Sequence, residues 1–110
     1  MIDWIRVAEL RDEIGPEDFE EVAELFLLEV EDTLSRLPGA MNDTAQMQEY
    51  MHFLKGSALN LGFCDVTDLC SQGESDAAAG RLTVDIHRLK DLYVQSRAVF
   101  EAGYAKRFAA

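Results

Sequence analysis

The sequence contains few of the residues that mark disulfide-rich, metal-binding or disordered proteins. Its 110 residues include two cysteines, two prolines and seven glycines. Cys64 and Cys70 are six residues apart, which matches neither a redox CxxC pair nor a zinc site, so we expect two reduced thiols. The scarcity of proline and glycine, with no low-complexity tract, argues against a disordered chain.

Basic charge is also scarce. Ten lysines and arginines face 21 aspartates and glutamates, which gives a formal net charge of −11 and a pI near 4.4. Nucleic acid and anionic membrane surfaces usually require a cluster of basic charge on their partner. The composition therefore excludes nucleic acid and membrane as expected partners and favours another protein.

Long apolar runs are missing as well. The first residues, MIDWIRVAELRDE, are acidic where a secretory signal requires a basic start and an uninterrupted apolar stretch. No later segment reaches the length needed to cross a bilayer. We therefore expect a cytoplasmic protein.

Hydrophobic residues make up 48% of the chain and recur at helical spacing almost throughout. We predict one domain over residues 1–110, monomeric and all-α: an antiparallel up-down-up-down four-helix bundle with an additional short N-terminal helix packed across one end. The predicted helices cover residues 3–13, 16–37, 43 or 44–61, 64–79 and 83–107. Gly73 weakens the prediction of the fourth helix.

The inward faces of three predicted helices can be read from the spacing of their apolar residues. They consist of Phe19, Val22, Phe26, Val30, Leu34 and Leu37 in the second helix, Met47, Met51, Leu54, Ala58 and Leu61 in the third, and Ile86, Leu89, Tyr93, Ser96 and Phe100 in the fifth.

His52 lies on the opposite side of the third helix from its apolar face, about 140° away at 100° per residue, so its imidazole should face solvent. Gly56 follows one turn later on the same outward face. A glycine inside a helix costs about 1 kcal/mol relative to alanine. Its presence is explained if another protein must approach the imidazole closely. Lys55 brings a positive charge beside this face.

This arrangement suits the transfer of a phosphoryl group. The ordinary pKa of histidine is near neutrality, so much of it carries a lone pair that can attack phosphorus. The product is a phosphoramidate, which is labile enough to be passed on. Lys55 would offset the added negative charge through a charge-assisted hydrogen bond.

The segment H-F-L-K-G-S-A-L-N-L-G, His52 through Gly62, resembles the HxxKGS…G signature of the histidine-containing phosphotransfer (HPt) family of two-component phosphorelays. The resemblance implies that His52 exchanges a phosphoryl group with aspartates of response-regulator receiver domains, and that Lys55 assists. Gly56 would leave room for the partner, Ser57 would fill a small polar position and Gly62 would end the helix.

The resemblance also implies the partners and cofactors. We expect receiver domains and a hybrid histidine kinase as partners, no metal or other cofactor bound by this chain, and Mg²⁺ in the receiver. The protein would be a phosphoryl carrier and not an enzyme by itself. The alternative is a helical adaptor that binds receiver or kinase domains without being phosphorylated.

A polar residue that orients the histidine ring is common in this family, often a glutamine about 22 residues later. That spacing reaches Glu74, whereas the available glutamine is Gln72. Either residue is a candidate, and the position can also be unused.

Other residues near His52 allow two interpretations. Leu59 lies within about 20° of His52 on the helical wheel, so it belongs either to a docking patch or to the margin of the buried face. Phe53 is ambiguous for the same reason. Ser57 is better explained as a small residue at a helix contact, and His87 has no comparable neighbours.

Two other classes fit the residues less well. A metal-binding bundle enzyme using His52 and His87 would lack the ExxH pair typical of such sites. A histidine-kinase dimerisation helix would need an ATP-binding domain, and the sequence has no nucleotide-binding glycine motif.

Overall fold

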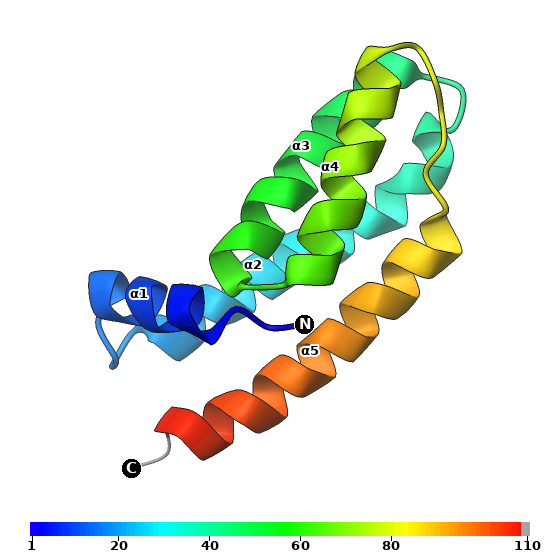
Figure 1. Ribbon diagram of the computed structural model, residues 1–110. Helices are drawn as coiled ribbons and strands as arrows, with labels where there is room; N and C mark the ends of the chain where they lie inside the picture. The colour runs from blue at the N-terminus through cyan, green and yellow to red at the C-terminus, as the bar shows by residue number, and fades with distance from the viewer. Residues whose placement is uncertain (109–110) are drawn as a thin grey trace.

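The computed structural model describes residues 1–108 and is all-α, which confirms the predicted fold class. The elements are α1 (Trp4–Ile14), α2 (Phe19–Arg36), the 3₁₀ helix η1 (Leu37–Ala40), α3 (Thr44–Leu61), α4 (Cys64–Ala78) and α5 (Ile86–Phe108) (Figure 1). Within residues 1–108, the β-type pairing is a single isolated bridge between Ile2 and Phe63. Among residues 1–108, no helix combines the length and the hydrophobicity that spanning a membrane requires.

Local sequence signals account for the start and end of α3. The Asp43 carboxylate caps its first turn and accepts a hydrogen bond from the Gln46 amide at 3.0 Å. Gly62 ends the helix in the left-handed region with φ of +74°, and its amide donates to the Leu59 carbonyl at 3.1 Å. The chain then reverses and enters α4 at Cys64.

The predicted boundaries of two other helices are wrong by three residues at the N-terminal end. Helix α2 begins at Phe19 and not at Pro16, because residues 16–18 form a turn in which the amides of Asp18 and Phe19 donate to the Gly15 carbonyl. Helix α5 begins at Ile86 and not at residue 83. Thr83 lies in the extended segment before it, where its hydroxyl donates to a carboxylate of α4.

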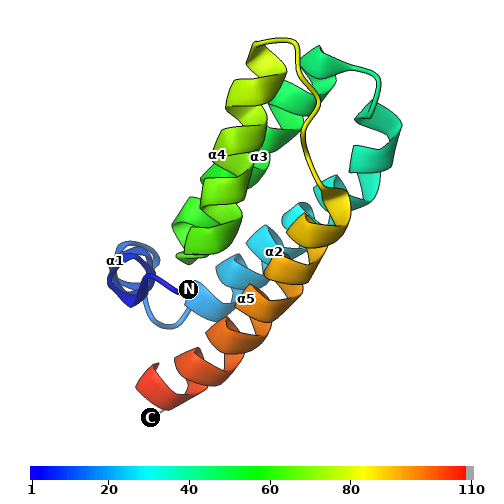
Figure 2. The same cartoon turned by 45° about the vertical axis from the view of Figure 1, so that its right-hand side comes forward.

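Figures 1 and 2 show the same arrangement of the helices around the core. Helices α3 and α4 lie side by side and run in opposite directions, while α5 runs along α2 (Figures 1 and 2). Helix α1 lies across one end, where Trp4 stacks on Phe100 of α5 with ring centroids 6.1 Å apart.

The core confirms the predicted inward face of α3 completely, since its five apolar residues are at most 1% exposed. The face predicted for α2 is partly wrong. Val22 and Phe26 are only partly buried, whereas Ala23 and Leu27 are buried. Helix α2 packs between two neighbours, so its buried arc is displaced from the stripe that spacing alone indicates. In α5 the four later predicted residues are buried, and Ile86 is partly buried.

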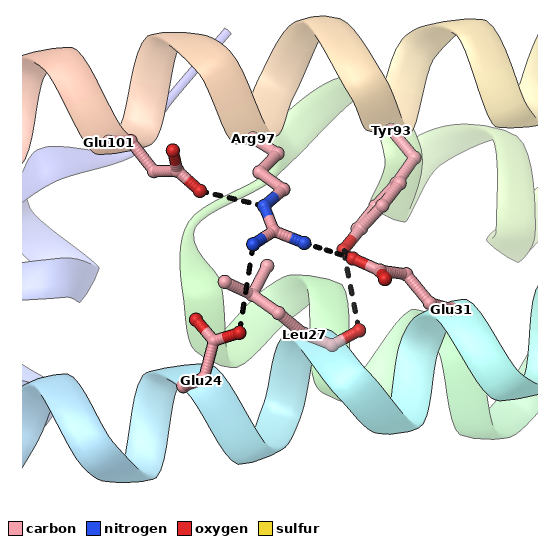
Figure 3. A network of polar contacts seen from close by, with 6 residues as sticks. All are labelled: Glu24, Leu27, Glu31, Tyr93, Arg97 and Glu101. Atoms are coloured by element: carbon pink, nitrogen blue, oxygen red, sulfur yellow. Dashed lines mark hydrogen bonds and ion pairs between the residues drawn. The ribbon is translucent and has the colours of Figure 1, made fainter.

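A polar network joins α5 to α2 (Figure 3). The buried Tyr93 hydroxyl lies 2.6 Å from a carboxylate oxygen of Glu31, and Arg97 forms an ion pair with the same carboxylate. Arg97 also contacts Glu101 at 2.7 Å and Glu24 at 3.7 Å. Burial, together with the neighbouring Glu31 carboxylate, raises the pKa of Tyr93. The hydroxyl therefore stays protonated and can donate.

Candidate functional site

His52 projects from the outward face of α3, opposite the buried apolar residues. Its side chain is 72% exposed, as the helical spacing predicted. Because the ring lies on a regular helix, its backbone position is fixed, while its edge remains open to a partner.

The surface beside His52 is open at Gly56. A Cβ atom built at this glycine would have nothing within 4 Å. The glycine is therefore not required by packing inside this chain. Two apolar side chains flank the opening: Leu59 is 56% exposed and Phe53 is 41% exposed. The ring is thus surrounded by a surface that another protein can contact.

Glu74 of α4 connects the two polar residues of this face. One carboxylate oxygen, Oε2, lies 2.7 Å from Nδ1 of His52, and the other, Oε1, forms an ion pair with Lys55 Nζ. The Glu74 side chain is 19% exposed and that of Lys55 is 33% exposed. The three side chains form a cluster, His52–Glu74–Lys55, in which one carboxylate has two partners.

Gln72, the other candidate for the orienting position, points elsewhere. Its side-chain amide donates to Oδ1 of Asp76 at 3.0 Å. Asp76 also accepts hydrogen bonds from Arg81 at 3.1 Å and from Thr83 at 2.5 Å. Gln72 therefore belongs to a cluster that holds the connection from α4 to α5, and Glu74 is the candidate in contact with the imidazole.

The chemistry of the carboxylate determines which ring nitrogen is free. The hydrogen bond from Lys55 is the largest cause that lowers the pKa of Glu74 below its ordinary value, and the His52 contact adds to it. Glu74 is therefore ionised at neutral pH and can only accept hydrogen bonds. Its contact with Nδ1 assigns the proton of a neutral His52 ring to Nδ1. The lone pair then lies on Nε2, the ring nitrogen that does not contact Glu74.

Ser57 and His87 complete the set of residues considered from the sequence. Ser57 is buried at 6% exposure, as expected for a small residue at a helix contact. His87 is exposed on α5 and belongs to a different helix from the cluster. Among residues 1–108, no group of three histidine, cysteine, aspartate or glutamate side chains is arranged to hold a metal ion.

Gly73 is a residue whose importance the helical spacing alone does not indicate. Helix propensity at this position only weakens the prediction of the fourth helix. A Cβ atom there would lie 2.9 Å from Val84 Cγ2 and 3.0 Å from Met51 Sδ. The absent side chain permits close packing of α4 on α3 beside the cluster. A helix-interior glycine directly before Glu74 was the available signal.

Comparison with known proteins identifies the family of the chain. The family model described as Hpt domain matches residues 21–99, from the first turn of α2 to the middle of α5. The positions of His52, Lys55 and Glu74 fall within this range. No match was found among curated proteins or among solved structures. Because the matched segment covers well over half of the chain, the protein belongs to the Hpt domain family.

Proposed function

We propose that this protein is a phosphoryl carrier of a two-component phosphorelay, and that His52 carries the phosphoryl group. Hpt domains are phosphocarrier modules that interact with receiver domains and kinases. One observation supports His52 most strongly: its Nδ1 contacts an ionised carboxylate while its Nε2 edge is exposed beside the open backbone of Gly56.

The proposed transfer is a displacement at phosphorus. Nε2 of His52 attacks the phosphorus of an aspartyl phosphate on a receiver domain. A nitrogen–phosphorus bond forms as the bond from phosphorus to the aspartate oxygen breaks, and the electron pair of that bond leaves with the carboxylate. The Nδ1 proton stays on the ring against Glu74, and Lys55 is within reach of the phosphoryl oxygens. Delivery to a second receiver is the reverse reaction.

The docking surface in this proposal is centred on α3. Gly56 allows close approach, while Leu59 and Phe53 supply exposed apolar area around the histidine. Leu28 of α2 lines the same hollow as Phe53 and is 53% exposed, so the apolar area continues onto α2. We favour the docking interpretation of Leu59 because the residue is far more exposed than a core-margin position requires.

The remaining parts of the proposal follow from the family. A hybrid histidine kinase and response-regulator receivers are the proposed partners, and Mg²⁺ is assigned to the receiver and not to this chain. The four long helices are taken as an up-down-up-down bundle that acts as a monomer. A cytoplasmic location stays a prediction.

The direct test is transfer of radiolabel from phosphorylated receiver domains. Wild-type protein should acquire label that is acid-labile and base-stable, and His52→Gln should acquire none. His87→Gln is the matched control and should behave as wild type. Label that persists in His52→Gln would contradict the site. If the wild-type protein and His52→Gln both bind receiver domains and neither acquires label, the protein is a non-phosphorylated adaptor instead.

A further inference from the structure

The carboxylate of Glu74 has two partners in the structure, and phosphorylation at His52 would affect both. Oε2 contacts the imidazole and Oε1 contacts the Lys55 ammonium. Because Lys55 forms an ion pair with Glu74, its ammonium group balances much of the negative charge of the carboxylate. The imidazole of His52 therefore experiences only part of that charge. The following inference rests on the proposed function, since it concerns the phosphorylated state.

A phosphoryl group on Nε2 would compete for Lys55. It carries about −1.5 to −2 charge and three acceptor oxygens, against a single charge on the carboxylate. Lys55 lies one helical turn from His52 on the same side of α3, so its flexible side chain can reach either anion. Its side chain is 33% exposed.

We infer that phosphorylation transfers Lys55 from Glu74 to the phosphoryl group, and that the charge of Glu74 then acts on the imidazole alone. The uncompensated carboxylate holds a proton on Nδ1 and keeps the phosphorylated ring in its cationic form. When the nitrogen–phosphorus bond breaks, its electron pair returns to Nε2, and a ring protonated at Nδ1 leaves as neutral imidazole. Glu74 therefore shortens the lifetime of the phosphorylated carrier and favours onward transfer.

Other charged groups around α3 have different partners. Glu49, one turn before His52, is near the Gln46 side-chain amide at 3.5 Å. On α2, Asp32 pairs with Arg36 at 3.0 Å beside the Phe53 hollow. On α1, the guanidinium of Arg6 donates to Asn60 near the C-terminal end of α3. Glu74 and Lys55 are thus the charges in direct contact with the site.

The test is a double-mutant cycle between Glu74→Gln and Lys55→Met, measured in both states of the protein. Gln keeps an oxygen that accepts from Nδ1–H but removes the charge, and Met keeps the aliphatic stem of lysine. Phosphorylation with potassium phosphoramidate requires no partner protein. The readouts are the urea midpoint of the unphosphorylated proteins and the half-life of phosphohistidine at neutral pH, with label on His52→Gln subtracted as background.

Glu74→Gln should lengthen the half-life by about fivefold, the effect of one nearby charge at a site where the imidazole is exposed and the carboxylate is largely buried. Lys55→Met should shorten it. In the unphosphorylated protein the two substitutions should be non-additive in stability, because the residues are paired. In the phosphorylated protein the effect of Glu74→Gln should be the same with or without Lys55.

Three results would overturn the inference: an unchanged half-life in Glu74→Gln, an unchanged half-life in Lys55→Met, or an effect of Glu74→Gln that appears only when Lys55 is absent. In the unphosphorylated proteins, the ¹⁵N shifts of the His52 ring should show Nδ1–H in both wild type and Glu74→Gln, which excludes simple loss of orientation. Failure to label His52 at all would contradict the proposed function, whereas label with the wrong pattern of half-lives contradicts only this inference.

Discussion

Gly73 of α4 lies directly against Met51 of α3, so that a Cβ atom at residue 73 would be 3.0 Å from the Met51 sulfur. The residues that follow these two in the sequence are Glu74 and His52, whose side chains are in contact at 2.7 Å. The buried glycine contact and the exposed polar contact are therefore neighbours on the same pair of helices. Close packing of Gly73 on Met51 allows the short distance between Glu74 and His52.

Gly73→Ala should weaken both the fold and the site. Alanine improves helix propensity by about 1 kcal/mol, but overpacking costs about 1 to 3 kcal/mol. We expect a net loss of about 1 kcal/mol in the free energy of unfolding, measured with urea. Displacement of α4 should also move the ¹⁵N shift of His52 Nδ1 away from its wild-type value.

Gly56→Ala is the matched control for this substitution. It also lies inside a helix, but its Cβ would meet nothing within 4 Å. It should stabilise the protein by about 1 kcal/mol and leave the Nδ1 shift unchanged. Equal stability changes in the two variants would contradict the packing role of Gly73.

Gly56→Gln tests whether the open surface serves a partner. The larger side chain should leave chemical labelling by phosphoramidate nearly unchanged, because this small donor needs little space. Transfer from a receiver domain should become slower, since the side chain lies one turn from His52 on the docking face. Parallel time courses with the two donors measure this difference. Equal rates with the receiver for wild type and Gly56→Gln would remove the steric role of Gly56.

Gly62→Ala should be the most damaging glycine substitution on α3. Its φ of +74° is unfavourable for alanine, and the new Cβ would lie 2.6 Å from the Asp3 carbonyl oxygen. We expect a loss of about 2 kcal/mol or more in the free energy of unfolding. Gly80→Ala separates the two causes: its φ is +83° with nothing within 4 Å, so it should cost only about 1 kcal/mol. Similar losses for both variants would argue against the contact with Asp3.

Asp76 should make the fold sensitive to acid. Hydrogen bonds from Thr83, then Arg81 and Gln72, lower the pKa of its carboxyl below its ordinary value. The folded protein therefore holds this proton more weakly than the unfolded chain. The resulting stabilisation is present above the unfolded pKa of about 3.9 and is lost as pH falls through the lower folded value.

Urea midpoints measured from pH 7 to about pH 3 test this contribution. Asp76→Asn should show a smaller loss of stability below about pH 4 than the wild-type protein. Thr83→Val removes the strongest of the hydrogen bonds and should give an intermediate result. An identical acid dependence in Asp76→Asn and wild type would contradict the role of this cluster.

The sequence predicted best where one helix face decides the outcome. The buried face of α3 and the exposed position of His52 followed from spacing alone, because α3 has a single continuous apolar side. The face of α2 was displaced because its contacts with α3 and α5, which spacing does not specify, decide which of its residues are buried. The predicted start of α5 was wrong because the Thr83 hydroxyl donates a hydrogen bond to Asp76 of α4. Helix propensity takes no account of such a tertiary contact.

The polar partner of His52 shows the same limit. Spacing left Glu74 and Gln72 as alternatives, because their positions depend on how α4 returns along α3. That alignment is determined by the left-handed turn at Gly62 and the close contact at Gly73. Both are backbone features, and their effect on the position of α4 relative to α3 cannot be read from helical spacing. The Arg97 network between α2 and α5 likewise joins residues more than sixty positions apart.

The atom that carries phosphorus can be identified by NMR of the protein phosphorylated with phosphoramidate and labelled with ¹⁵N. Coupling between ³¹P and the ring nitrogens distinguishes Nε2 from Nδ1, and His52→Gln and His87→Gln assign the residue. The contact of Glu74 with Nδ1 predicts phosphorus on Nε2 of His52, with a proton retained on Nδ1. Phosphorus on Nδ1 of His52, or on His87 in place of His52, would contradict the proposed site.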